Sequence, residues 1–265
     1  MLALDRILLI SAISGLLGLD ATAAVQVMVS RPLVVGGLVG WLMGDAPLGL
    51  AIGSLVEMLW IGGVPVGSLV PPDGTQAAAF AAVAAIQLKA ASVYPGAPQA
   101  AGSVALVASV AVGALGAQAE ILQRRLAGTL SRRAERAVEA GQPGALARAL
   151  AAALGLAWMR GAMVCGLSLA LGLPLMDRLL AALPLEAIRA LDWCFWLFWL
   201  LGLAVVADHF WERRALKLVG AGALVLALLG STLRASQANL LLVAVALAHA
   251  AGFWRWSRAR RGEAA

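Results

Sequence analysis

The sequence predicts an all-α fold: a polytopic helical membrane protein, with broken or re-entrant helices in its N-terminal third and a cytoplasmic amphipathic helix. Hydrophobic residues make up 62% of its 265 residues and charged residues only 13%, a balance far from that of soluble globular domains. The mean hydropathy is +0.90. Apolar runs of about 20 residues, the length that spans a bilayer as a helix, recur along the chain. We therefore expect residues 1–265 to form a single domain in a lipid bilayer.

Charge and cysteine content argue against several other classes of protein. Cys165 and Cys194 both lie in apolar stretches, so neither a disulfide framework nor a cysteine metal site is indicated. The net charge of +6 could suggest nucleic acid, but the arginines flank hydrophobic segments, as positive residues do on the cytoplasmic side of a membrane. We expect no nucleic-acid partner, no metal and no cofactor.

The first predicted span is the apolar run from Ile7 to Leu19. Hydrophobic segments follow it directly, which argues against a cleaved signal peptide. The Arg31-Pro32 step is expected to end this first helical unit at its cytoplasmic edge, because a proline drives the residue before it out of the helical conformation. Two more spans, 75–94 and 100–119, are separated by a turn containing proline and glycine. These elements make residues 1–119 the first part of the domain.

Residues 30–77 do not look like ordinary spans. Their apolar runs are short and are interrupted at Pro32, Gly44-Asp45-Ala46-Pro47, Gly62-Gly63, Pro65 and Pro71-Pro72-Asp73. Backbone freed by such breaks cannot face lipid and must be buried in protein or line a watery cavity. Transporters commonly place their substrate at breaks of this kind. We expect re-entrant or broken helices here.

Residues 120–150 form a charged segment in which apolar side chains recur at four-residue steps, namely Leu122, Leu126, Leu130, Ala134 and Val138. This pattern predicts a cytoplasmic amphipathic helix, ended by Gly141-Gln142-Pro143-Gly144. The helix either is a solvated linker, or lies on the membrane surface or docks a cytosolic partner. The pattern does not choose between these roles.

Residues 151–256 are predicted to form a bundle of four spans, at 156–176, 193–210, 216–233 and 238–254. Arginine-rich clusters lie before the first span, between the second and third, and after the fourth. Four spans place all three clusters on one side of the membrane, which is the cytoplasmic side by the positive-inside rule. The C-terminal tail, residues 257–265, is therefore expected in the cytoplasm.

Glu57 is the leading candidate for a functional residue. Small residues recur at four-residue steps along two helix faces, with Gly36, Gly40 and Gly44 on one, and Gly49 and Gly53, followed by Glu57, on the other. Close helix packing explains the glycines. A carboxylate in such an apolar stretch costs roughly 2.5–3.5 kcal/mol at the bilayer centre on insertion scales, and such groups usually face inward and have a function. A structural ion pair is the alternative for Glu57.

Asp45, Asp73 and Gln26 complete the set of candidate substrate-binding residues. Asp45 and Asp73 each follow a break in the helical pattern, so each can cap the next helix. A carboxylate is also a good acceptor for sugar hydroxyls, and the amide of Gln26 both donates and accepts. Asp20 and Gln26 share no helix face and are not expected to act as a pair.

A series of short motifs runs through residues 26–76: Ser30-Arg31-Pro32-Leu33, Gly40, Gly44-Asp45, Gly49, Gly53, Glu57-Met58, Gly62, Gly67 and Pro72-Asp73. In this order and spacing they resemble the IIC membrane subunit of the mannose/fructose/sorbose-type sugar phosphotransferase system. The rest of the chain agrees with that family in length, hydropathy and its charged cytoplasmic segment.

The resemblance implies a permease for a hexose or related sugar in a bacterial inner membrane. It also implies a second membrane subunit, IID, cytosolic IIA and IIB components, and assembly as an oligomer. In that family, phosphohistidine-bearing IIB phosphorylates the sugar as it emerges, and IIC binds and moves the sugar without carrying a phosphoryl group. We therefore expect no catalytic residues in this chain.

Two other functions remain open on the sequence alone. A non-transporting regulatory or scaffold relative would keep the fold and bind cytosolic partners through residues 120–148. An intramembrane enzyme is the weakest alternative, because no Ser/His/Asp, Cys/His or metal-spaced His/Glu constellation is present.

Overall fold

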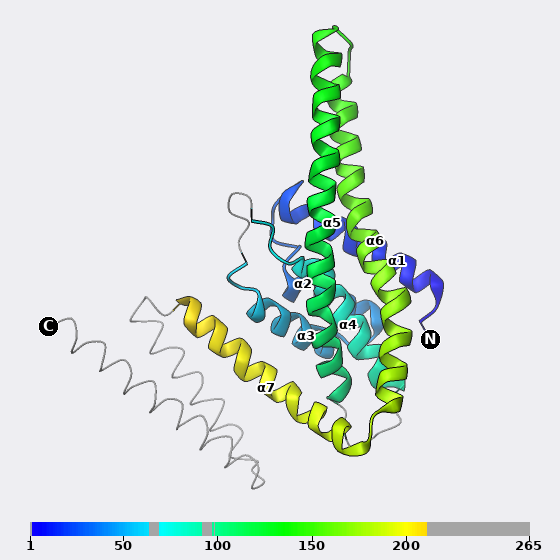
Figure 1. Ribbon diagram of the computed structural model, residues 1–265, viewed down its shortest axis with the longest axis vertical. Helices are drawn as coiled ribbons and strands as arrows, with labels where there is room; N and C mark the ends of the chain where they lie inside the picture. Colours follow the sequence, from blue (N-terminus) through cyan, green and yellow to red (C-terminus); the bar gives the residue numbers. More distant parts are fainter. Residues whose placement is uncertain (1, 64–68, 92–96, 98, 211–265) are drawn as a thin grey trace, which may run out of the picture. The chain divides into compact units, whose positions relative to one another are not determined.

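The computed structural model describes residues 2–63, 69–91, 97 and 99–210. Within these residues the chain forms seven α-helices and no strand (Figure 1), which confirms the predicted all-α class. The helices are α1 (Leu4–Thr22), α2 (Pro32–Met43), α3 (Ala46–Leu59), α4 (Gly74–Ala91), α5 (Ala100–Glu139), α6 (Ala145–Ala182) and α7 (Leu185–Phe210). The predicted spans at 216–233 and 238–254, and the tail at 257–265, lie outside the described residues.

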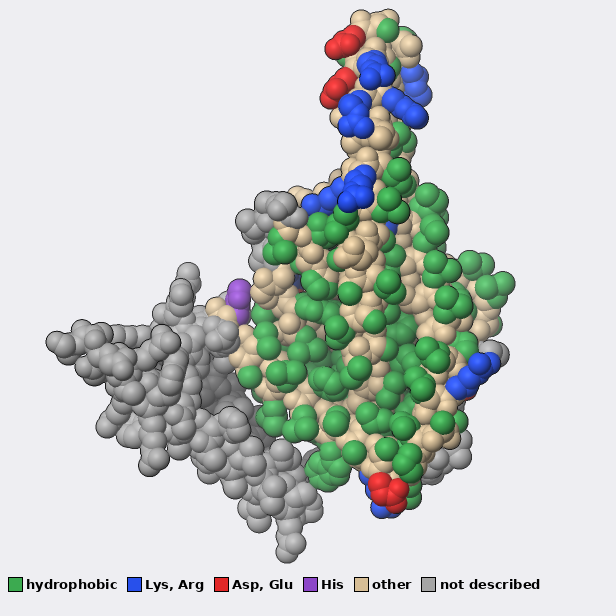
Figure 2. All heavy atoms as spheres, viewed as in Figure 1, with side chains coloured by type: hydrophobic (Ala, Val, Ile, Leu, Met, Phe, Trp, Pro, Cys, Tyr) green, Lys and Arg blue, Asp and Glu red, His purple; other side chains and the backbone are tan. Residues whose placement is uncertain are grey.

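Three of the described helices are long and apolar enough to cross a bilayer: α5, α6 and residues Leu185–Val206 of α7. In α6 and α7 only 17% of the most apolar window is buried within the chain. Figure 2 shows hydrophobic side chains covering much of the visible surface. Such a surface suits lipid or an apolar partner.

Helix α4 lies at the centre of the helical packing, where it contacts α1, α2, α3, α5 and α6. All residues from Ala77 to Ala85 are at most 1% exposed. The segment is mostly alanine, and small side chains let neighbouring helices approach closely in a membrane. Residues 75–91 of the predicted span at 75–94 thus lie in a helix that other helices enclose.

Helices α2 and α3 confirm the expectation of broken helices. They have 12 and 14 residues, whereas about 20 are needed to span the hydrocarbon core. Gly44 ends α2 with a φ of 83°, a left-handed conformation that glycine adopts without steric cost. The two helices meet through the glycines predicted to pack, and a Cβ on Gly40 would lie only 2.7 Å from Gly49 Cα.

The Arg31-Pro32 step was expected to end the first helical unit, and this prediction is wrong. Helix α1 already ends at Thr22, and Pro32 is the first residue of α2. Proline is favoured at the first helical position because its fixed φ suits a helix and the missing N–H would have no helical partner there. The same step therefore starts a helix instead of ending one.

The charged segment is not a separate helix beginning near residue 120. Helix α5 runs without a break through Glu139, and α6 begins at Ala145. Gly141 and Gly144 have φ values of 69° and 71° in the turn between them, which is where the end of the helix was predicted. At 1.5 Å per residue, the 40 residues of α5 reach about 60 Å, roughly twice the hydrocarbon thickness. Figure 2 shows the charged side chains gathered at the hairpin end.

Candidate functional site

A pocket of about 350 Å³ lies beside the broken helices. Its walls come from the end of α1, the α1–α2 loop, the start of α2, the end of α3, the start of α4, and the facing sides of α5 and α6. Sites for small molecules measure about 300–1,000 Å³, so the pocket suits a ligand at the small end of that range. Much of its lining is polar or charged, unlike the apolar outer surface.

The pocket brings together three of the four predicted site residues. Gln26, Glu57 and Asp73 all line it, although they come from the α1–α2 loop, the last turn of α3 and the segment before α4. Asp45 does not line it. The structure therefore assembles one polar site from residues that are separated by some 50 positions in the sequence.

Glu57 connects the end of α3 to the start of α2. Its carboxylate forms an ion pair with the Arg31 guanidinium and accepts a hydrogen bond from the Leu33 backbone N–H at 3.3 Å. A carboxylate at a helix N-terminus is stabilised by the unpaired N–H groups and the helix dipole. The Glu57 side chain is 15% exposed and that of Arg31 is 48% exposed, so both retain access to the pocket.

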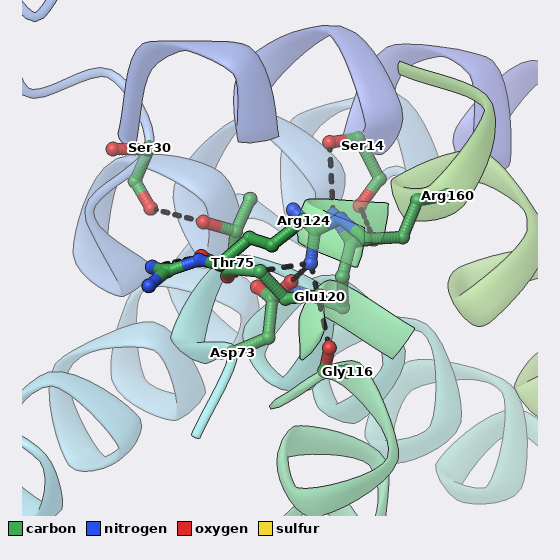
Figure 3. A network of polar contacts seen from close by, with 9 residues as sticks. Ser14, Ser30, Asp73, Thr75, Gly116, Glu120, Arg124 and Arg160 are labelled. Atoms are coloured by element: carbon green, nitrogen blue, oxygen red, sulfur yellow. Dashed lines mark hydrogen bonds and ion pairs between the residues drawn. The ribbon is translucent and has the colours of Figure 1, made fainter. Parts of the chain in front are cut away.

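Asp73 anchors a second group of charges (Figure 3). One carboxylate oxygen accepts a hydrogen bond from the Gln76 N–H at 3.1 Å and so caps α4, while the other lies 2.8 Å from Nη1 of Arg160. Arg160 Nη1 also lies 3.7 Å from Glu120 Oε2. Glu120 in turn accepts two hydrogen bonds from Arg124. The group joins the start of α4 to the interiors of α5 and α6, at one wall of the pocket.

Arg160 is a site residue that the sequence reasoning missed. Its side chain is only 8% exposed, as is that of Asp73, and among the described residues its Nε is a buried atom with no hydrogen-bond partner. A signal was available, because Arg160 stands inside the predicted span 156–176, and an intramembrane arginine usually has an acidic partner and a function. The sequence does not say which carboxylate that partner is.

The loop between α1 and α2, residues 23–31, forms another wall of the pocket, and we call it the strap. Val25, Gln26 and Met28 in the strap have φ values of 69°, 57° and 70°. The Gln26 N–H donates to the Ala24 carbonyl at 2.9 Å, which closes a classic γ-turn around Val25, a rare and strained conformation. Each such residue costs on the order of 1–3 kcal/mol and persists only where its surroundings hold it.

Asp20 holds the strap and was not among the predicted site residues. It is 5% exposed. Its Oδ1 accepts from the Val27 N–H at 2.5 Å, and its Oδ2 accepts from the N–H and the hydroxyl of Ser30, both at 3.0 Å. The Thr75 hydroxyl donates to the Ser30 carbonyl at 2.8 Å, as Figure 3 shows. Asp20 thus binds the strap at Val27 and Ser30, and the strap also carries Gln26.

Asp45 lies at the opposite end of α2 and α3 from Glu57, in the turn between these helices. Its carboxylate accepts from the Leu48 N–H at 3.2 Å, which caps α3, and it pairs with Lys89 at 2.8 Å. The capping role considered from the sequence is thus observed for both Asp45 and Asp73. Only Asp73 combines it with a place in the pocket.

The acidic groups of the site do not suggest a metal centre. Nowhere in the described ranges do three or more His, Cys, Asp or Glu side chains gather in a way that could hold a metal ion. The carboxylates of Asp20, Glu57 and Asp73 instead accept hydrogen bonds or pair with arginines. The pocket therefore presents carboxylates, guanidinium groups and an amide, which are hydrogen-bonding groups for a polar ligand.

Comparison with known proteins identifies what the chain is similar to. The family described as "PTS system sorbose-specific iic component" matches residues 5–250. A solved structure described as "Structure of membrane protein" is 19% identical with a TM-score of 0.59, covering 95% of this chain and 94% of that one. The cryo-EM structure of the mannose transporter ManYZ in complex with microcin E492 is 21% identical with a TM-score of 0.53, covering 92% of both chains. No protein of curated function matches the sequence significantly.

Proposed function

Because the chain belongs to the family of sorbose-specific IIC components of the sugar phosphotransferase system, we propose that it binds a hexose or related sugar in the pocket and moves it across the membrane. It is a membrane component of a sugar transport system. To this role the proposal adds which residues bind the sugar, which helices move during transport and which other subunits take part.

The observation that carries the proposal is the convergence of Gln26, Glu57 and Asp73 on one pocket. A sugar presents several hydroxyl groups, each of which donates one hydrogen bond and accepts others. Ionised carboxylates form short, strong bonds with such donors. The guanidinium of Arg31, half-exposed beside Glu57, supplies donors for the sugar oxygens, so that Glu57 and Arg31 can bind adjacent hydroxyls.

The broken helices supply a way to move the sugar. Helices α2 and α3 form a close pair through their glycines. Arg31 at the start of α2 and Glu57 near the end of α3 both line the pocket. In transporters with discontinuous helices, one unit moves against the rest of the protein around the bound substrate. We propose that α2 and α3 move together as such a unit, with α4 to α6 as the surrounding framework.

The proposed partners follow from the family. A IID subunit would complete the membrane complex, and the apolar faces of α6 and α7 offer it a surface within the bilayer. Of the cytosolic IIA and IIB components, IIB would phosphorylate the sugar as it emerges into the cytoplasm. We propose a bacterial inner membrane as the location, a cytoplasmic C-terminus, and an oligomeric complex.

The test of the proposal is the variant Glu57→Gln, assayed for phosphoenolpyruvate-dependent uptake of a hexose panel in vesicles that contain IID, IIA and IIB. Glutamine keeps the size of the side chain and removes its charge. Loss of a hydrogen bond to a charged group is worth about 1.5–3 kcal/mol, so we expect uptake to fall about 10- to 100-fold at sub-saturating sugar. Glu186→Gln, exposed in the first turn of α7 and outside the pocket, is the matched control and should transport normally.

Two results would contradict the proposal in different ways. Normal uptake by Glu57→Gln, with normal insertion, would remove Glu57 from sugar binding. No uptake of any sugar by the unmodified chain with all its partners would favour the non-transporting scaffold instead.

A further inference from the structure

We infer that Asp20 is a positioning residue that sets sugar selectivity by holding the strap, residues 23–31, in its strained conformation against the pocket. This inference rests on the proposed function, and it concerns a residue that the family motifs and the sequence pattern did not single out. Asp20 acts through the strap, which carries pocket residues Gln26, Met28, Ser30 and Arg31.

The first step of the argument is the strain in the strap. Val25, Gln26 and Met28 are all left-handed without being glycine, and Val25 is β-branched, which makes a positive φ a genuine outlier. Val25 and Met28 are 81% and 71% exposed, so burial of these residues does not compensate for the strain. Something other than apolar packing must keep the strap in place.

The second step is that Asp20 supplies the restraint. Both of its carboxylate oxygens are occupied by strap donors, one by Val27 N–H and the other by the N–H and hydroxyl of Ser30. Hydrogen bonds to a carboxylate are about twice as strong as those between neutral groups. Asp20 itself is fixed in α1 and nearly buried. The strap is therefore tied to a rigid helix at two points on either side of Met28.

The third step links the strap to the sugar site. Ser30 is followed by Arg31, which pairs with Glu57, and the Ser30 carbonyl accepts the Thr75 hydroxyl close to Asp73. Gln26 lies between the γ-turn at Val25 and the first Asp20 contact at Val27. Restraint by Asp20 thus fixes both Gln26 and Arg31. The positions of hydrogen-bonding groups decide which hydroxyl orientations a site accepts, because a mismatched sugar leaves buried polar groups unpaired.

The test is Asp20→Asn in the full transport assay, with KM and maximal rate measured separately for each sugar of a hexose panel. An asparagine amide replaces one acceptor oxygen by a donor group, so one set of strap donors loses its partner. We expect KM for the preferred sugar to rise at least about tenfold, the maximal rate to change less, and the differences between epimeric hexoses to shrink. Asp5→Asn, exposed in the first turn of α1, is the matched control.

A second variant separates positioning from simple folding. Glycine adopts positive φ values without steric cost, so Val25→Gly should relieve strain in the strap. The double variant Asp20→Asn/Val25→Gly should recover much of the lost affinity. If Asp20→Asn fails to insert, Ser30→Ala, which removes the hydroxyl contact to Asp20 and leaves the backbone contact, should still raise KM a few-fold, and Val25→Gly in the same chain should reverse part of that rise.

The outcomes distinguish this inference from the proposed function. Normal uptake by the unmodified chain, together with unchanged KM and unchanged sugar ranking in Asp20→Asn, would overturn the role of Asp20 alone. So would an unchanged KM in Ser30→Ala where Asp20→Asn does not insert. Absence of sugar uptake by both the unmodified chain and Asp5→Asn would overturn the proposed function, and the inference with it.

Discussion

Asp45 and Asp73 occupy matching places in two different regions of the molecule. Each follows a break in the chain, each caps the helix after it through one carboxylate oxygen, and each pairs with a cation through the other oxygen at 2.8 Å. Their surroundings differ. The Asp45 and Lys89 side chains are 27% and 47% exposed, whereas Asp73 and Arg160 are each 8% exposed.

The difference shows that two carboxylates with the same local geometry can differ widely in burial. Exposed ion pairs contribute little, with a median of about 0–1 kcal/mol. A buried charge that loses its partner costs about 3–5 kcal/mol. We therefore expect Asp73 to stabilise the packing of α4, α5 and α6 around the pocket by more than Asp45 stabilises the turn in which it lies.

The largest expected effect is that of Asp73→Asn. Asparagine caps helices about as well as aspartate, so the variant removes the charge and leaves the cap. Glu120 remains 3.7 Å from Arg160 and offsets part of the loss, so we expect the lower end of the range, about 3 kcal/mol. Thermal unfolding of the purified chain in detergent measures the change, with Asp45→Asn as the matched control. Equal losses in the two variants would contradict the distinction between the two regions.

An intermediate effect is expected for Gly40→Ala. This variant tests whether close packing of glycines, and not the Asp45 ion pair, stabilises the turn between α2 and α3. A Cβ at this position would lie 2.7 Å from Gly49 Cα and 2.9 Å from the Asp45 carbonyl oxygen. Backbone must move to admit it, and overpacking of this kind costs about 1–3 kcal/mol. Gly155→Ala in α6, where a Cβ would meet nothing within 4 Å, should be neutral or slightly stabilising in the same unfolding measurement. A loss in Gly155→Ala as large as that in Gly40→Ala would argue against close packing as the cause.

The sequence was sufficient to predict the features that depend on local chemistry. The interruption at Gly44-Asp45 could be predicted without knowing the neighbours, because Gly44 favours a helix end, Asp45 favours the cap of a new helix and Pro47 favours its first turn. Glu57 could be singled out because a carboxylate is costly in an apolar stretch at any position. The glycine faces of α2 and α3 likewise followed from helical spacing alone.

The features that the sequence did not reveal depend on contacts between distant residues. Arg160 and Asp73 are 87 positions apart, and they meet only because Gly116 leaves room for Asp73, where a Cβ would overlap it. The role of Asp20 depends on the fold of the strap, whose left-handed residues are not glycines. The continuity of α5 was missed because a change from apolar to charged composition alters the surroundings of a helix without ending it.

The smallest expected effect is at Asp45 itself, and it divides into two parts. Asp45→Ala removes both the cap and the ion pair, and loss of a cap typically costs about 1 kcal/mol. Lys89→Gln removes only the ion pair, which is largely exposed, so its cost should stay below about 1 kcal/mol and should decrease further at high salt. Thermal unfolding at low and high salt measures both variants. A salt-independent loss in Lys89→Gln that exceeds the loss in Asp45→Ala would mean that Lys89 stabilises the α2–α3 turn by contacts other than its ion pair. In that case the difference in burial would no longer explain why Asp45 and Asp73, which cap their helices in the same way, contribute differently to stability.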